Sequence, residues 1–491
     1  MSHSPIAARH LPRRKLWLFR CLAVLVGLSP LLALELGLRI AGIGKPTDAN
    51  DPFVGFSSIQ PLFVRNDSTN RFEIAKSRLT HFQPDSFAAT KSKGEFRIFV
   101  LGGSTVQGRP WSIETSFTTW LELCLNAADS SRNYQVVNCG GVSYASYRLV
   151  PILKEVLQYE PDLIIFCEGN NEFLEDRSYA PLREQPALLF WLQQQAHRLR
   201  TYNLLRAGVL ACSSHHENQP NQLGPEVDAR LDWRDGMEDF HRDEIWQRDV
   251  VRHFEFNLRR MTAIAREAKV PLVFVTPVTN LQWAPFKSEH RADLSTSDIA
   301  KFNTLRKEAS ELIADNLPAA IEKLQAATVL DPEYADAQYE LGAALLEAGR
   351  RNEAEAALRR AKECDVCPLR ILQPMHEILH RVAAATHTPL VDAEALFAKL
   401  SRNGFPDNQW LIDHCHPTIE GNQQLADAIA SKLVELNYLQ PSDDWQTQKE
   451  AAYQQHFAGL PHAYFERGRA RLKSEQGWAR GQVKKQREAR P

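Results

Sequence analysis

The side chains best suited to nucleophilic chemistry are a serine and a histidine–carboxylate pair that lie far apart in the chain. Gly102-Gly103-Ser104-Thr105 follows an apolar run and leads into a helical pattern, which puts the Ser104 hydroxyl at a helix N-terminus. A serine attacks a carbonyl only when a base takes its proton and preorganised donors hold the oxyanion. Asp413-His414-Cys415-His416-Pro417 stands near the end of the predicted domain, leads into a helix and has a carboxylate and a histidine three residues apart, close enough to converge within one turn. A glycine before a helix-capping serine is by itself common structure.

Two further polar blocks follow apolar runs. Asn138-Cys139-Gly140-Gly141-Val142-Ser143-Tyr144 comes after the second run and Gly169-Asn170-Asn171-Glu172 after the third. In this order, the four blocks resemble those of the SGNH (GDSL-like) hydrolase family. The resemblance implies that Ser104 is the nucleophile, His416 the general base and Asp413 its orienting carboxylate.

The same resemblance implies an oxyanion hole made by the Ser104 N–H, the Asn171 amide and an N–H near Gly141 or Ser143. The second-block glycine of the family aligns with Ser143, and Glu172 stands where the family has Asp. We therefore expect a main-chain donor at 141–143 without fixing which residue supplies it. Candidate residues of the substrate pocket are Gly169, Asn170, Glu172 and Lys287.

Five short apolar runs alternate with helical stretches, which predicts a parallel sheet covered on both faces. The expected strands are 96–101, 134–137, 162–166, 271–276 and 389–391, and the expected helices lie near 113–127, 146–158, 245–268 and 373–386. This is the pattern of an α/β, flavodoxin-like three-layer sandwich with a five-stranded sheet. Since ligands bind at the carboxyl ends of such strands, the polar blocks stand where chemistry is expected.

Other segments depart from this alternation. We assign 44–92 to a connector, 93–300 and 369–438 to the two parts of the hydrolase domain, and 177–243 to an irregular insertion or lid. The segment 301–368 repeats with a period of 34 residues and resembles the tetratricopeptide (TPR) repeat, so it is a candidate for binding a protein partner or for a structural appendage. The segment 439–491 is expected to be a helical, basic tail.

The N-terminus predicts a membrane anchor. Basic residues within 1–15 precede an apolar stretch over 16–43, whose charge-free part, Cys21 to Leu34, has 14 residues. A membrane span needs about 20 residues. The usable helix can be lengthened because Arg20 and Arg39 can extend their charged ends to the membrane interfaces. We expect an uncleaved transmembrane signal anchor, with a cleaved signal peptide or a buried helix as alternatives. Basic residues ahead of the stretch place the catalytic domain outside the cytoplasm, on the periplasmic face of a bacterial inner membrane.

Composition and rival motifs narrow the function. A net charge of −2 argues against a dedicated nucleic-acid binder. Cys364 and Cys367 form a CxxC without a second pair, which favours a local disulfide or two unpaired thiols over a zinc site. His376-Glu377-Ile378-Leu379-His380 matches the zincin HExxH, but its apolar positions are those of a helix that covers the sheet. An α/β-hydrolase nucleophile elbow, GxSxG, fits poorly, because Val106 stands where that motif has its last glycine.

We therefore expect a serine esterase or deacylase that needs no metal or organic cofactor. Its substrate is expected to be an acyl ester, on an acylated glycan or lipid of the cell envelope. The alternatives are an O-acyltransferase with the same triad and a catalytically silent, membrane-anchored TPR scaffold.

Overall fold

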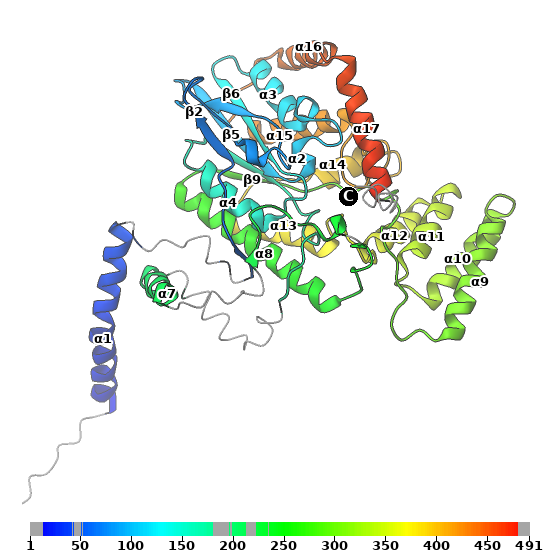
Figure 1. Cartoon of the computed structure of the whole chain (residues 1–491), viewed down its shortest axis with the longest axis horizontal. Coiled ribbons are helices and arrows are strands. Elements are labelled where there is room, and N and C mark those ends of the chain that lie inside the picture. The colour runs from blue at the N-terminus through cyan, green and yellow to red at the C-terminus, as the bar shows by residue number, and fades with distance from the viewer. Residues whose placement is uncertain are drawn as a thin grey trace, which may run out of the picture. The chain divides into compact units, whose positions relative to one another are not determined.

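The computed structural model describes residues 13–41, 43, 51, 53–179, 196, 199–212, 222–233 and 235–479. The chain divides into two compact units (Figure 1). One unit comprises 1–57 and 177–223, and the other comprises 58–176 and 224–491. The larger unit holds the predicted site.

A five-stranded parallel sheet forms the centre of the larger unit, as the alternating sequence pattern predicts. Its strands, in chain order, are β5 (Glu95–Gly102), β6 (Asn133–Gly140), β7 (Leu163–Cys167), β9 (Leu272–Val275) and β10 (Leu390–Val391). Their spatial order is β10-β9-β7-β5-β6, which is the doubly wound order of flavodoxin-like folds. The α/β class and the five-stranded parallel sheet are thus confirmed, and the order reverses between β5 and β7.

Helices cover both faces of the sheet (Figure 1). One face carries α3 (Phe117–Ala128), α15 (Ile419–Glu435) and α16 (Trp445–Ala458), and the other carries α4 (Ser146–Val156), α8 (Glu244–Ala268) and α13 (Gln373–Thr386). The strands are apolar on both sides because both faces are buried, and Ile98, Val100, Leu163 and Ile165 join the core beneath α3 and α15. Short helices α2 (Ser104–Gln107) and α14 (Ala393–Leu400) follow β5 and β10.

The stretch assigned to a connector contains a second, smaller sheet. Strands β2 (Phe63–Asn66), β3 (Arg71–Ile74) and β4 (Ser86–Ala88) pair antiparallel in the order β2-β3-β4. Phe63 and Phe87 pack edge-to-face against each other, with ring centroids 5.0 Å apart, and Phe87 packs on Phe99 of β5 at 5.2 Å. The prediction of a plain connector was therefore wrong for 63–88.

Two helical hairpins separate β9 from β10. They consist of α9 (Thr296–Leu312), α10 (Leu317–Leu330), α11 (Ala335–Glu347) and α12 (Arg351–Glu363). Gly342 of α11 allows close approach of α12, since a Cβ there would lie 2.6 Å from Leu358 Cγ. The hairpins pack on the sheet domain through Leu358, which lies against Leu281 and Phe405, and through Tyr339, whose hydroxyl donates to the Gln282 carbonyl at 2.9 Å.

The CxxC after α12 forms no disulfide. Cys364 and Cys367 are both buried thiols, which matches the second of the two expected alternatives. The chain then returns to the sheet, and beyond α15 and α16 it ends in α17 (His462–Ala479). The remainder of the predicted basic tail, 480–491, lies outside the described residues.

The smaller unit contains α1 (Arg13–Ala41), α7 (Arg200–Cys212) and a parallel pairing of β1 (Gly55–Phe56) with β8 (Gln222–Leu223). In the part of the chain that the structure describes, no helix is both long and apolar enough to cross a membrane. The predicted transmembrane anchor over 16–43 is therefore not supported. Within this unit the Glu35 carboxylate accepts the backbone N–H groups of Arg200 and Thr201 at the start of α7, both at 3.0 Å.

Two other predictions fall partly or wholly outside the described residues. The basic segment 1–15 is described only from residue 13, and 180–195 and 213–221 of the expected lid are not described. The expected extracytoplasmic location depended on the anchor and stays a prediction.

Candidate active site

Ser104 is the first residue of α2, and one residue separates it from the end of the interior strand β5. The turn between strand and helix is made by Gly103, whose φ is −89° and ψ −150°. A Cβ at Gly103 would lie 2.2 Å from Glu168 Oε2 and 2.4 Å from Asn171 Nδ2, so only glycine fits there. This arrangement presents the Ser104 hydroxyl at a helix N-terminus beside the loop that follows β7.

A chain of hydrogen bonds joins Ser104, His416 and Asp413. His416 Nε2 lies 2.7 Å from Ser104 Oγ, and His416 Nδ1 lies 2.7 Å from Asp413 Oδ2. The second carboxylate oxygen, Asp413 Oδ1, accepts the backbone N–H groups of Cys415 at 3.0 Å and His416 at 2.9 Å. The carboxylate therefore fixes both the backbone turn and the ring, as the three-residue separation predicts.

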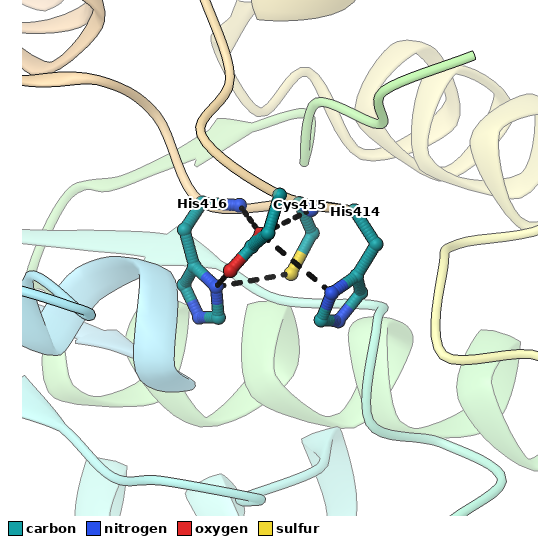
Figure 2. Close-up of side chains that lie close together, drawn as sticks. His414, Cys415 and His416 are labelled. Atoms are coloured by element: carbon teal, nitrogen blue, oxygen red, sulfur yellow. Dashed lines mark hydrogen bonds and ion pairs between the residues drawn. The ribbon is translucent and has the colours of Figure 1, made fainter. Parts of the chain in front are cut away.

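The neighbouring loop holds this segment in place. Asn280 donates two hydrogen bonds to it: its backbone N–H donates to the His414 carbonyl at 2.9 Å, and its Nδ2 donates to the Asp413 carbonyl at 2.9 Å. His414 and Cys415 place their side chains next to the His416 ring (Figure 2). The His414 ring also packs edge-on against Phe286, with centroids 5.1 Å apart.

The electrostatics of the buried pair favour the ionised form of each partner. Burial works against the Asp413 charge, but the charges of His416 and His414 and the hydrogen bond from His416 hold the pKa of Asp413 well below its usual range. Burial likewise opposes protonation of His416, and the Asp413 carboxylate outweighs it and raises the pKa of His416 well above its ordinary value. An imidazolium formed at His416 is therefore stabilised.

Three of the four expected oxyanion donors lie on the cavity that contains Ser104. Ser104, Ser143 and Asn171 all line it. The Gly141 N–H instead donates to the Gly102 carbonyl at 3.0 Å, so Gly141 is not available as a donor. Among the described hydrogen bonds the Ser143 N–H has no acceptor.

Ser143 adopts the backbone conformation that a glycine would adopt. Its φ is +65°, in the left-handed region that favours glycine. This conformation is compatible with the alignment of Ser143 on a glycine position, and the role of Ser143 as a donor stays a prediction. The Asn171 amide donates one N–H to the Tyr144 carbonyl at 3.1 Å, which leaves its second N–H for a ligand.

Glu168 is a residue of the site that sequence reasoning missed. It is 3% exposed, and its Oε1 accepts the backbone N–H groups of Gly169, Asn170 and Asn171 at 2.9, 2.8 and 3.0 Å. Burial raises its pKa to about 8 despite these hydrogen bonds, and the neighbouring Glu172 adds to the rise. The only sequence signal was a carboxylate placed directly after a buried strand.

The four candidate pocket residues do not line the cavity among the residues that the structure describes. Gly169 packs on Ile371, Asn170 Oδ1 accepts the Ile371 N–H at 2.8 Å, and Glu172 Oε1 accepts the Ser146 N–H at 2.6 Å. Lys287 Nζ donates to three carbonyl oxygens, those of Met237, Glu238 and Phe240. Their roles are structural, so the expectation of a substrate contact was wrong.

The cavity has a volume of about 280 Å³. Apolar and polar side chains both line it. The apolar ones are Val142, Leu174, Ala229, Trp283 and Leu369, and the polar ones beyond the triad and its neighbours are Arg109, Asp232, Ser474, Glu475 and Gln476. Arg109 Nη1 and Glu475 Oε1 form an ion pair at 2.5 Å, which ties α17 to the loop that follows α2. Ligand pockets usually measure about 300–1,000 Å³, so this cavity suits a small group.

The HExxH motif lies on α13, a helix that covers the sheet. His376 Nε2 lies 2.7 Å from Glu394 Oε2, and Arg359 lies 2.9 Å from the other oxygen of the same carboxylate. His380 is exposed and lies 3.5 Å from Asp392. Glu394 is thus paired with both His376 and Arg359.

Comparisons with known proteins found a family match for the hairpins and solved structures with a similar fold. The model of the TPR repeat family matches residues 314–349, which span α10 and α11. No curated protein matches the chain. Among solved structures the chain is similar to an α/β hydrolase from the metagenome of Lake Arreo, Spain, with 13% identity, 69% of this chain and 94% of that chain covered, and a TM-score of 0.32.

Two further structures are similar to the same extent. An acetylxylan esterase from Geobacillus stearothermophilus has 12% identity, with 69% of this chain and 94% of that chain covered and a TM-score of 0.31. A lipase/acylhydrolase from Enterococcus faecalis has 12% identity, with 71% and 99% covered and a TM-score of 0.31. Identities this low leave the chemistry of the site to be argued from its own residues.

Proposed function

We propose that the chain is a serine esterase that cleaves its substrate through an acyl-enzyme on Ser104. The hydrogen-bonded chain from Ser104 Oγ to His416 and on to Asp413, with 2.7 Å at each step, carries this proposal. It supplies a nucleophile, a base in contact with it and a carboxylate that orients the base, which is the arrangement that activates a serine hydroxyl. A scaffold without catalysis would have no need of this alignment.

The reaction begins when Ser104 Oγ attacks the ester carbonyl and His416 Nε2 takes the hydroxyl proton. Asp413 accepts the Nδ1 hydrogen bond and stabilises the imidazolium. His416 then gives the proton to the departing alcohol, and the acyl group stays on Ser104. Water then attacks the acyl carbon while His416 Nε2 takes one of its protons. The bond from the acyl carbon to Ser104 Oγ breaks, Oγ takes that proton from His416, and the acid leaves.

The developing oxyanion needs donors that are already in position. The N–H groups of Ser104 and Ser143 and the second amide N–H of Asn171 supply them, since all three residues line the same cavity. Glu168 keeps this arrangement rigid, because its carboxyl group accepts the N–H of Asn171 and of the two residues before it.

We propose a substrate with a small acyl group on a polar, hydroxyl-rich alcohol, such as an acylated glycan. The cavity volume of about 280 Å³ limits the group held near Ser104, and the lining combines apolar side chains with Arg109, Asp232 and Gln476. A long-chain lipid would need a larger apolar surface. The origin of such a glycan in the cell envelope is a prediction from the N-terminal sequence.

Labelling and hydrolysis together test the proposal. A fluorophosphonate probe should label the wild type and not Ser104→Ala, because only an activated serine reacts. With a panel of aryl esters of increasing acyl length, Ser104→Ala and His416→Ala should each lower kcat by roughly 10⁴-fold. Absence of labelling in the wild type would refute the proposal, and product formation that requires an added sugar would assign acyl transfer instead.

The TPR-like hairpins are proposed to support the site as well as to offer a surface for a protein partner. Tyr339 donates to the carbonyl of Gln282, the neighbour of Trp283, and Arg370 donates to the Trp283 carbonyl at 2.8 Å. These contacts connect α11 and the chain after α12 to a residue that lines the cavity. Two measurements on the full chain and its Tyr339→Phe variant would separate the two roles. A change in the rate of ester hydrolysis would indicate support of the site, and a pull-down would measure binding of a protein partner.

A further inference from the structure

Four side chains with metal-ligating atoms lie together beside the cavity. The ligand atoms of Asp413, His414, Cys415 and His416 all lie within 4.8 Å of one another, the one such group in the described part of the chain. Figure 2 shows the Cys415 thiol between the two imidazole rings. The proposed hydrolysis uses Asp413 and His416 and assigns no role to the side chains of His414 and Cys415.

We propose that these four residues form an inhibitory site for a thiophilic divalent cation of the zinc class. The inhibitory part rests on the proposed function, and the binding part does not.

The separations are close to those that a tetrahedral ion requires. With Zn–S near 2.3 Å and Zn–N or Zn–O near 2.0–2.1 Å, neighbouring ligand atoms lie about 3.3–3.6 Å apart. Cys415 Sγ lies 3.9 Å from His416 Nδ1, and His414 Nδ1 lies 3.6 Å from Asp413 Oδ1. To hold an ion, the 2.7 Å contact between His416 Nδ1 and Asp413 Oδ2 must widen, and any pair near the 4.8 Å upper limit must draw together.

The backbone of the cluster is already fixed, which lowers the cost of ordering the ligands. Asp413 Oδ1 accepts the N–H groups of Cys415 and His416. Asn280 bonds the carbonyl oxygens of Asp413 and His414. An ion can reach the cluster because Asp413, His414 and His416 line the cavity.

The donor set determines which ions fit. One thiolate and two imidazole nitrogens favour Zn²⁺ over Mg²⁺ and Ca²⁺, which prefer oxygen ligands. Cys415 binds as thiolate and releases its proton to solvent. The thiolate and the Asp413 carboxylate together balance the two positive charges of the ion.

Inhibition follows from the position of one proton. In the triad, His416 carries a proton on Nδ1, donates it to Asp413 and keeps Nε2 free to accept the Ser104 proton. A metal ion on Nδ1 requires that nitrogen's lone pair, so the proton of the neutral ring moves to Nε2. The ring then donates to Ser104 Oγ and cannot act as its base.

Binding is tested on metal-free Ser104→Ala protein, which keeps all four ligands and needs no catalytic activity. Titration calorimetry with Zn²⁺ should show one ion per chain, and Co²⁺ should give a thiolate charge-transfer band. Cys415→Ser in this background should abolish the band and weaken Zn²⁺ binding by about 100-fold or more, at or above the upper end of the 10–100-fold typical of an outer partner. His414→Asn provides a second variant that leaves the thiol in place.

Two controls address the rival motifs. Cys364→Ser removes a thiol of the CxxC, and His380→Ala removes the exposed histidine of the HExxH. Both should bind Zn²⁺ as tightly as their parent. Absence of stoichiometric binding by Ser104→Ala, or binding that neither Cys415→Ser nor His414→Asn weakens, would overturn the site.

Hydrolysis by the wild type tests the inhibitory part. Zn²⁺ should abolish ester turnover, Mg²⁺ at the same concentration should leave it intact, and a chelator should restore it. The Zn²⁺ concentration for half inhibition should rise roughly 100-fold in Cys415→Ser, relative to that variant's own zinc-free rate. Turnover that persists with the ion bound would refute inhibition. A chain inactive on all esters would refute the proposed function, and the calorimetry would still decide the site.

Discussion

Replacement of Glu168 by Gln tests whether burial outweighs the hydrogen bonds of the loop that positions Asn171 in setting the pKa of Glu168. Glutamine has nearly the shape of the protonated acid, and its oxygen can accept the same three backbone N–H groups that Oε1 accepts now. The substitution therefore removes the ability to ionise and changes little else. We expect Glu168→Gln to be more stable than the wild type at alkaline pH and about equally stable at acidic pH.

The sign follows from the direction of the shift. The pKa of Glu168 is raised from 4.5 to about 8 in the folded state. As pH rises from 4.5 towards 8, the unfolded chain loses this proton and the folded chain keeps it, so the wild type loses stability over that interval. At about 1.36 kcal/mol per pH unit, the cost reaches roughly 3–5 kcal/mol at pH 9. Glutamine carries no such cost.

Urea unfolding of both proteins at several pH values between about 5 and 9 measures this difference. The advantage of Glu168→Gln in free energy of unfolding should be near zero at the acidic end, grow through neutral pH and level off near the pKa of about 8. An advantage that does not grow with pH would show that the three N–H groups keep Glu168 ionised in the fold. It would refute the conclusion that burial outweighs them.

Glu353→Gln is the matched control. Glu353 is exposed, and the hydrogen bond from Arg350 holds its pKa below the usual value. It is ionised in both the folded and the unfolded chain throughout the range tested. Its effect on stability should therefore be small and independent of pH.

Three further predictions concern the oxyanion loop. Asn171→Ala should lower kcat for ester hydrolysis by about 10²–10³-fold; a loss below about 10-fold would mean that the amide serves only the Tyr144 carbonyl. Ser143→Gly should keep kcat within about threefold, because the N–H remains, and its Tm in a thermal melt should not fall, since glycine avoids the roughly 1 kcal/mol cost of a left-handed residue. Gly103→Ala should lower both Tm and kcat, because its Cβ would lie 2.2 Å from Glu168 Oε2; a variant as stable and active as the wild type would contradict the packing described.

The sequence predicts the large sheet well because its strands are buried on both faces. Runs such as Leu163–Cys167 are wholly apolar and are bounded by polar residues, so their positions follow from composition. The small sheet over 63–88 gave no such signal. Its strands are three or four residues long, and one of them reads Arg71-Phe72-Glu73-Ile74. The packing of Phe63 and Phe87 on Phe99, which joins them to the core, depends on contacts between distant segments.

Some residues of the candidate site could likewise be predicted from the sequence, and others could not. Ser104, Asn171, Asp413 and His416 could be found because their blocks occur in a fixed order. The main-chain donor of the oxyanion hole could not be predicted in this way. Whether residue 141 or 143 can supply it depends on the Gly102 carbonyl, which accepts the Gly141 N–H. Likewise, the contacts of Asn170, Glu172 and Lys287 depend on long-range packing that spacing does not encode.

The position of the hairpins between β9 and β10 has a consequence for how the chain reaches its native state. Pairing Phe274 with Leu390 joins residues 116 positions apart (390 minus 274). Closing a loop of that length costs about 4 kcal/mol of chain entropy, and this cost grows with the logarithm of its length. Helices α9 to α12 make mostly local contacts, and such elements form within microseconds to milliseconds. Once folded, they shorten the flexible part of the loop and lower the cost by about 1 kcal/mol. Early folding of the hairpins therefore offsets part of the entropy cost that their insertion adds, before the edge strand β10 docks and brings Asp413 and His416 to Ser104.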